Sequence, residues 1–368
     1  MHPWVRKRLL RLQERLGQGG IPLAIINNRE NIIYFTGLTQ VECLALLVPA
    51  EGEPCAVTIW LDADYVARET GLLTYGYRFP REHLAGKMVE CIRQQRYPVD
   101  TIGFERYFVT FPVYQYLREA LPHARMVDAS GVIYQLRSIK EPEEVECIRQ
   151  ASHAVVAGMK AAVEAVKVGV TELEVLAEAE YAMLKAGSEG SPFRAQVTAG
   201  ERVLLTHPCA SNRRIQAGEV VVIHLGATYR GYCSKMCRTV GVGEIPRQVM
   251  ETHRVLVEAQ EAAIEALKPG QPVSEVDRAA REVVEACGYG EWFLDVTGYG
   301  VGIRQSEFYP IIGKGRTETI AAGMVVDLLL STIYLPGVGG PRVTDVIYVG
   351  EEGNQLLTRW PKEMVLKE

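Results

Sequence analysis

The sequence lacks several features that would assign a chain of 368 residues to a class at once. It contains no apolar run near the roughly 20 residues that a membrane-spanning helix needs, and its amphipathic start has no signal-peptide core. Its net charge of -5 gives no electrostatic attraction to nucleic acid or to an acidic membrane surface. These absences predict a cytoplasmic protein whose partners are small molecules, peptides or other proteins.

The cysteines lack any paired arrangement. No two of them form a CxxC motif, and their scatter through a chain of this length favours reduced thiols over a disulfide framework. The eight cysteines stand at positions 43, 55, 91, 147, 209, 233, 237 and 287. The sequence therefore predicts neither a disulfide-stabilised domain nor a standard zinc motif.

The composition is that of a globular protein with more than one core. Hydrophobic residues make up 48% and charged residues 23% of the chain, whose length suits two domains. The first third alternates strand-like runs with helix-like segments, which predicts a mixed α/β sheet. At 138–142, Ser, Lys, Glu and Pro precede a long amphipathic helix. We therefore expect an N-terminal domain over residues 1–137 and a C-terminal domain over residues 138–368.

The C-terminal part contains an internal repeat. The segment AAVEAVKVG at 161–169 matches AAIEALKPG at 262–270, about 100 residues later. Each copy is followed by a second helix-like segment and then by a β-rich stretch. This pattern is typical of a domain built from two similar αβ halves, and a ligand site between the halves would draw residues from both.

Ordered motifs along the whole chain resemble those of the creatinase/prolidase/aminopeptidase P family. They are NRENIIYFTGL, LRSIKEPEEVECIRQA, THP, IQAGEVVVIHLGATYRGYCSKMCRTV, TGYGVGIRQSE, AAGMVV and GVGGPRVTDVIYVGEEG. The resemblance implies an α/β protein with a creatinase-like mixed-sheet N-terminal domain and a C-terminal domain with the pita-bread fold and a pseudo-twofold repeat. It also implies a homodimer, because relatives of this type generally pair through the N-terminal domain.

The resemblance implies five metal ligands that this sequence does not supply. Metallopeptidases of the family hold two metal ions with two Asp, one His and two Glu side chains. The corresponding residues here are His224, Lys235, Tyr299, Leu330 (or Leu329, if the insertion in DLLLSTIY lies elsewhere) and Thr344. An ammonium group repels a metal ion and a leucine has no lone pair to offer. We therefore expect no metal and no other cofactor at this site.

Other positions of the family's site keep their residue types. The resemblance aligns His207 with the histidine that shuttles protons in family hydrolases, including the metal-free creatinase. It also aligns Glu307, Arg342 and Asp345 with identical residue types, whereas Ser306 stands where the family has a second catalytic histidine. His207 is the candidate general base, although a lone histidine in a loop is often simply hydrogen-bonded.

The roles of two further residues remain open. Lys235 could anchor a substrate carboxylate together with Arg342, or it could form a salt bridge with Glu307 or Asp345 in place of the metal. Tyr299 could act as an acid or an oxyanion donor, or it could fill the space of the lost imidazole. The candidate catalytic residues are His207, Tyr299 and Glu307, and the candidate substrate-binding residues are Lys235, Arg342, His224, Ser306 and Thr344.

A replacement metal site is one more alternative. Cys233, Lys235 and Cys237 share one face of a strand by the period of two, so His207, His224 and Cys237 could hold a soft metal. Their spacing is not that of a zinc motif.

The functional prediction follows from the retained polar residues. We expect a metal-independent hydrolase of a C–N bond in a small polar, anionic substrate, by analogy with creatinase. Creatine itself is not expected, because the positions that would bind its guanidinium hold Cys237 and Thr344. The alternatives are a non-catalytic pita-bread protein that binds a peptide or metabolite, and an Xaa-Pro dipeptidase, against which the lost metal ligands argue.

Overall fold

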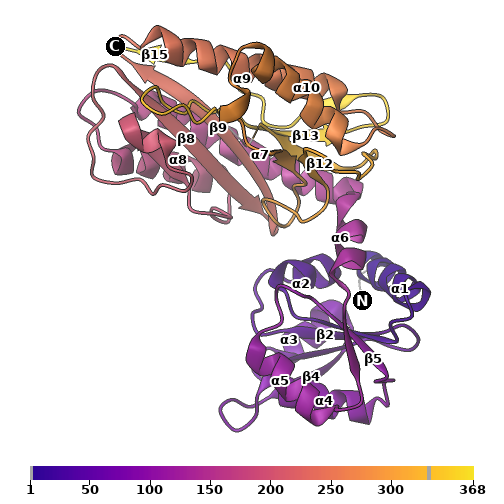
Figure 1. The fold of residues 1–368 in the computed structure, drawn as a ribbon. Helices are drawn as coiled ribbons and strands as arrows, with labels where there is room; N and C mark the ends of the chain where they lie inside the picture. The colour runs from indigo at the N-terminus through magenta and orange to yellow at the C-terminus, as the bar shows by residue number, and fades with distance from the viewer. Residues whose placement is uncertain (1–2, 330–332) are drawn as a thin grey trace. The chain divides into compact units, whose positions relative to one another are not determined.

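The computed structural model of the protein describes residues 3–329 and 333–368 (Figure 1). The chain divides into two units, Met1–Arg137 and Ser138–Glu368. Both units combine helices and strands, which confirms the predicted mixed α/β class. No described helix has the length and apolar character needed to cross a membrane.

Unit 1 is built on a six-stranded mixed sheet with the strand order β4-β3-β2-β1-β5-β6. Strand β1 pairs antiparallel with β2 and parallel with β5. The strands are β1 Leu23–Ile26, β2 Ala45–Pro49, β3 Cys55–Ile59, β4 Leu73–Tyr77, β5 Thr101–Phe104 and β6 Arg125–Asp128. The helices are α1 Pro3–Gln18, α2 Arg29–Thr36, α3 Ala63–Thr70, α4 Leu84–Gln94, α5 Phe111–Ala120 and α6 Ser130–Ser138. Figure 1 shows the sheet between α1 and α2 on one side and α4 and α5 on the other.

Unit 2 contains the two αβ halves that the repeat predicts. The first half comprises α7 Pro142–Ala165, α8 Glu172–Lys185, β7 Gln196–Ala199, β8 Glu219–Tyr229 and β9 Tyr232–Val242. The second comprises α9 Arg247–Ala266, α10 Val273–Ala286, β10 Val296–Tyr299, β11 Ile311–Gly313, β12 Val325–Leu328, β13 Asp345–Val349 and β14 Asn354–Leu356. The last strand, β15 Val365–Lys367, returns to pair with β9. Each half has its own buried apolar cluster, between its helix pair and its strands.

Local sequence explains where several of these elements begin and turn. Thr171 and Glu174 form a reciprocal capping box at the start of α8, with hydrogen bonds of 3.1 and 2.7 Å. Strands β8 and β9 form a hairpin around Arg230 and Gly231, which both have positive φ angles of 48° and 78°. A two-residue turn with positive φ at both positions matches the twist of paired strands. The strand-turn-strand reading of 221–240 is thus confirmed.

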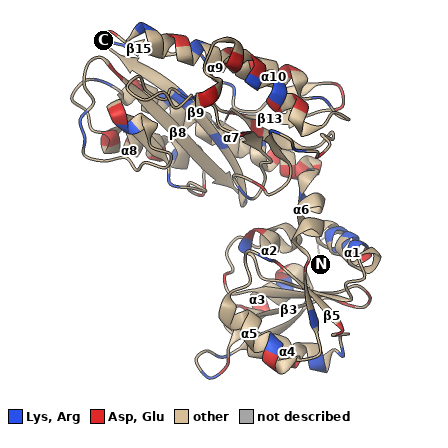
Figure 2. Ribbon diagram, viewed as in Figure 1, with Lys and Arg blue, Asp and Glu red and all other residues tan. Residues whose placement is uncertain are grey.

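Charges of both signs are interspersed on the outer helices of unit 2. Figure 2 shows Lys, Arg, Asp and Glu alternating along α9 and α10. On α10, Arg278 forms salt bridges with Glu275 and Glu282. These helices therefore present no continuous basic stripe of the kind that binds nucleic acid.

Close backbone crossings join the two halves of unit 2 and also two strands within the second half. Cys237 of β9 pairs with Thr344, which precedes β13. Gly298 of β10 lies so near β12 that a Cβ atom on it would stand 2.1 Å from the carbonyl oxygen of Asp327. A side chain cannot fit at that distance, so only glycine allows this crossing. The crossing places the end of β10 beside the end of β12.

Candidate functional site

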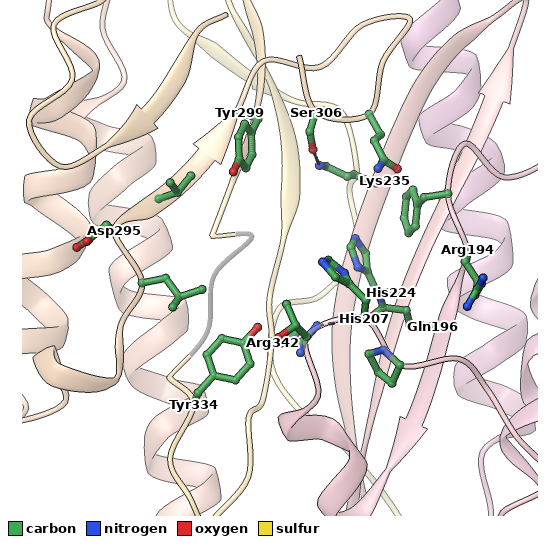
Figure 3. Close-up of a pocket in the computed structure, with 16 residues that line it drawn as sticks. Arg194, Gln196, His207, His224, Lys235, Asp295, Tyr299, Ser306, Tyr334 and Arg342 are labelled. Atoms are coloured by element: carbon green, nitrogen blue, oxygen red, sulfur yellow. Dashed lines mark hydrogen bonds between the residues drawn. The ribbon is translucent and has the colours of Figure 1, made fainter. Parts of the chain in front are cut away.

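A cavity of about 630 Å³ in unit 2 is lined by residues from both halves (Figure 3). Six of the eight predicted site residues line it, namely His207, His224, Lys235, Tyr299, Ser306 and Arg342. The structure does not bring the other two, Glu307 and Thr344, to the cavity wall. Thr344 is buried and donates a hydrogen bond of 2.8 Å to the carbonyl oxygen of Leu329. Glu307 is buried and accepts a hydrogen bond of 3.3 Å from the backbone N–H of Arg304.

Lys235, which lines the cavity, belongs to a buried ion pair. The Nζ atom of Lys235 forms a salt bridge with Oδ2 of Asp327, and the two side chains are 2% and 0% exposed. The Nζ atom also donates a hydrogen bond of 3.0 Å to Oγ of Ser306. The Oδ1 atom of Asp327 accepts one of 2.8 Å from the backbone N–H of Tyr299. Burial raises the pKa of Asp327, while Lys235 and the N–H of Tyr299 act in the opposite direction.

The structure corrects the salt-bridge partner that the sequence suggested for Lys235. The expected salt bridge would join Lys235 to Glu307 or Asp345, but Asp345 pairs with Arg238 at 2.8 Å. Asp327 was missed because it lies in β12, before the positions that resemble a metal ligand. The sequence carries one signal for Asp327, which is the single charged residue in the apolar run VVDLLL. A charge in such a run is expected to be buried, and a buried charge needs a partner.

His224 is held in the cavity wall as a neutral imidazole. It lies on β8, opposite Gln196 of β7 and Cys237 of β9. Its ring packs against Phe193 with 4.7 Å between ring centroids, and Nε2 has no hydrogen-bond partner. Burial lowers the pKa of His224 well below its usual value, and the positive charges of Lys235 and Arg342 lower it further. The buried Nε2 atom therefore has an unused capacity for a hydrogen bond among the described residues.

Arg342 brings a positive charge to the cavity and has no acidic partner among residues 3–329 and 333–368. Its guanidinium donates hydrogen bonds to the carbonyl oxygens of Leu205 and Val203 at 2.8 and 3.3 Å. It also donates one of 3.4 Å to Oε1 of Gln196, and its Nε atom has no hydrogen-bond partner. All three acceptors are neutral, so the charge of Arg342 is not cancelled by them. An anionic group in the cavity would complete its hydrogen bonding.

His207 lies in the loop that follows the short helix Gly200–Leu204. Figure 3 shows its ring beside that of His224, at the cavity. The side chain is exposed, and it forms no hydrogen bond with any described residue. The structure thus gives no support to a merely structural, hydrogen-bonded role for this histidine.

The residues at the family's ligand positions do not fit a pair of divalent ions. Lys235 contributes a positive charge, Leu329 is a buried hydrocarbon side chain, and Leu330 lies outside the described residues. Within residues 3–329 and 333–368, no group of three or more His, Cys, Asp or Glu side chains is arranged to hold a metal ion. Burial raises the pKa of Cys237 to about 12, which disfavours the thiolate form that binds a metal ion. The absence of metal in the protein itself stays a prediction.

Comparison with known proteins gives matches along almost the entire chain. The model of metallopeptidase family M24 matches residues 146–351, and the model of the creatinase/prolidase N-terminal domain matches residues 8–139. An Xaa-Pro dipeptidase of Pyrococcus furiosus is 30% identical over 98% of this chain and 100% of its own length. An uncharacterised peptidase of Bacillus subtilis is also 30% identical, over 98% of this chain and 99% of its own. A solved Xaa-Pro dipeptidase structure from Bacillus anthracis superposes with a TM-score of 0.90 at 28% identity, over 98% of this chain and 99% of that one.

Proposed function

Because the chain belongs to metallopeptidase family M24 and carries a creatinase/prolidase N-terminal domain, we propose that it hydrolyses a C–N bond in a short peptide-like substrate with an anionic group. The Xaa-Pro dipeptides named for its relatives are the first substrate class to test. The proposed chemistry uses side chains of the cavity in place of the two metal ions of the family.

The observation that carries this proposal is the distribution of charge around the cavity. Lys235 is neutralised by Asp327, whereas Arg342 meets only neutral acceptors. A carboxylate therefore finds a forked donor at Arg342, and a charged guanidinium binds a carboxylate more strongly than a neutral donor does. Lys235 acts mainly as a structural cation that holds Asp327 and Ser306 in place.

The catalytic step requires a base and a donor for the developing negative charge. His207 takes a proton from water, the water oxygen bonds to the substrate carbonyl carbon, and the C–N bond then breaks as the proton passes to the leaving nitrogen. Burial raises the pKa of Tyr299, so its hydroxyl keeps its proton and can donate a hydrogen bond to the carbonyl oxygen. The neutral ring of His224 lies in the same wall and can contact the substrate.

A second candidate, a metal-dependent Xaa-Pro dipeptidase, is favoured by the 30% identity to such an enzyme over nearly the whole chain. It requires metal ions to bind beside the ammonium group of Lys235 and the side chain of Leu329, which offers no lone pair. The two candidates differ in the expected effect of a chelator on turnover.

Turnover of a panel of Xaa-Pro dipeptides by chelator-treated protein tests the proposal. We expect hydrolysis to persist after metal removal. The substitution His207→Ala should lower kcat by about a hundredfold or more while ligand affinity changes little, because a general base acts on the chemical step. The matched control is His153→Ala, at an exposed position of α7, which should change neither quantity.

Two outcomes would overturn the proposal in different ways. Activity that appears only with added Mn²⁺ or Co²⁺ would establish the metal-dependent dipeptidase. A ligand that binds but is never hydrolysed, with His207→Ala indistinguishable from the unmodified protein, would establish a binding protein.

A further inference from the structure

Unit 1 contains a pair of buried cysteines that the proposed function does not use. Cys55 is the first residue of β3, and Cys91 lies in the last turn of α4. Their Sγ atoms are 2.7 Å apart, and the residues are 1% and 0% exposed. Neither thiol can therefore act on a bulky substrate from solvent, but each is the direct neighbour of the other.

The surrounding core fixes both side chains toward one another. Helix α4 packs on β3, and Cys91 shares its buried face with Met88 and Ile92. Tyr97, which is only partly buried, lies beside Cys55 and donates a hydrogen bond of 2.5 Å to the carbonyl oxygen of Glu53. The pair thus lies one side chain below the surface of unit 1.

We propose that Cys55 and Cys91 form a redox site that closes to an intramolecular disulfide when the protein meets a hydroperoxide. The sulfur atoms of a disulfide lie about 2.05 Å apart, so closing the bond requires a movement of roughly 0.7 Å. Cys55 stands at the start of its strand and Cys91 in the last turn of its helix.

The two thiols have distinct parts in the oxidation. The contact with Cys91 lowers the pKa of Cys55, whereas the contact with Cys55 and burial raise the pKa of Cys91. Cys55 releases its proton, and its thiolate attacks one peroxide oxygen and becomes a sulfenic acid. The other oxygen takes up that proton and leaves as an alcohol, or as water if the oxidant is hydrogen peroxide. The Cys91 sulfur then attacks the Cys55 sulfur, and water leaves with the thiol proton. The two thiols lose two electrons, which reduce the O–O bond.

Burial makes this site selective for small oxidants. Hydrogen peroxide is close in size to water and needs only a small local opening to reach the pair, whereas an alkylating reagent needs a much larger one. Cys43, Cys209 and Cys287 are exposed and should react with both. In the native protein, peroxide should therefore change the state of Cys55 and Cys91 while an alkylating reagent does not.

Peptide mapping by mass spectrometry after hydrogen peroxide treatment tests the inference. We expect a Cys55–Cys91 linked peptide that is lost on reduction. Because the bond closes a loop between positions 36 residues apart, the oxidised protein should unfold at a midpoint roughly 5–15 °C above that of the reduced protein. Comparing the two redox states of one chain removes any effect of a substitution on packing.

Variants provide the controls. Cys55→Ala and Cys91→Ala should each abolish the shift between redox states, whereas Cys287→Ala, at an exposed cysteine of unit 2, should retain it. The inference is overturned if Cys55 and Cys91 are both recovered as free thiols after a peroxide treatment that has oxidised the exposed cysteines. That result does not depend on whether any variant folds.

Discussion

At the scale of single residues, the central feature is the buried ion pair of Lys235 and Asp327. Lys235 and Asp327 are almost completely removed from solvent. Burying two charges costs hydration energy, which their mutual attraction offsets only when both partners are present. The pair therefore acts as a unit, and losing one member should matter far more than losing both.

The substitution Asp327→Asn should lower the free energy of unfolding by about 3–5 kcal/mol, because it leaves the Lys235 charge buried and unpaired. The substitution Glu258→Gln is the matched control. It breaks the exposed salt bridge with Arg254 and should cost less than about 1 kcal/mol. Urea denaturation of the three proteins measures both effects.

The double variant Lys235→Met, Asp327→Leu keeps this prediction testable if Asp327→Asn does not fold. An apolar pair of similar volume should restore most of the stability. Equal losses for Asp327→Asn and Glu258→Gln would show that the pair is not buried as described.

The sequence allowed six cavity residues to be predicted because each stands in a motif with a fixed place in the fold. His207, Tyr299 and Arg342 are examples. Asp327 could not be found in this way, because its importance comes from Lys235, a residue 92 positions away in a different strand of the same unit. Glu307 and Thr344 stand at motif positions but do not line the cavity, and only the packing of the chain decides this.

At the scale of helices and strands, the sequence predicts best those elements that neighbouring residues determine. The likeness to solved prolidase-type structures confirms the creatinase-like N-terminal domain and the C-terminal pita-bread domain. The hairpin of β8 and β9 follows from nearby residues. The bridges between Cys237 and Thr344 and between Gly300 and Val326 join distant segments, and no local pattern predicts them.

Helix α9 carries a buried histidine that should make stability depend on pH. Burial, with a smaller contribution from Arg238, lowers the pKa of His253 from 6.5 to about 4. Between these values the unfolded chain binds the proton and the folded chain does not, so stability is present above about pH 6.5 and is lost as the pH falls toward 4. Because the unfolded chain takes up the His253 proton, the free energy of unfolding should fall by about 3 kcal/mol between pH 7 and pH 4.

Denaturation of His253→Gln at both pH values checks this expectation. The loss of stability on acidification should be smaller in His253→Gln than in the unmodified protein. It should be unchanged in His153→Gln, because that side chain is exposed. Identical losses in all three proteins would contradict the assignment to His253.

At the scale of the whole molecule, the fold and the site point to different conclusions about metal. The family match covers residues 146–351, and the relatives named above are peptidases. A shared fold supports many chemistries, so activity must be argued from the residues of the site. Here those residues are an ion pair, a neutral imidazole and an arginine without an acidic partner. The homodimer and the cytoplasmic location stay predictions.

The central claim is that this cavity works without the two metal ions of the family, and elemental analysis tests it most directly. The protein is dialysed against Mn²⁺, Co²⁺ or Zn²⁺, then against metal-free buffer, and its metal content is measured by mass spectrometry. The account predicts well below one ion per chain, in the unmodified protein and in His224→Ala alike, because Lys235 and Leu329 supply neither negative charge nor lone pairs. One or two ions per chain, lost in His224→Ala, would contradict it.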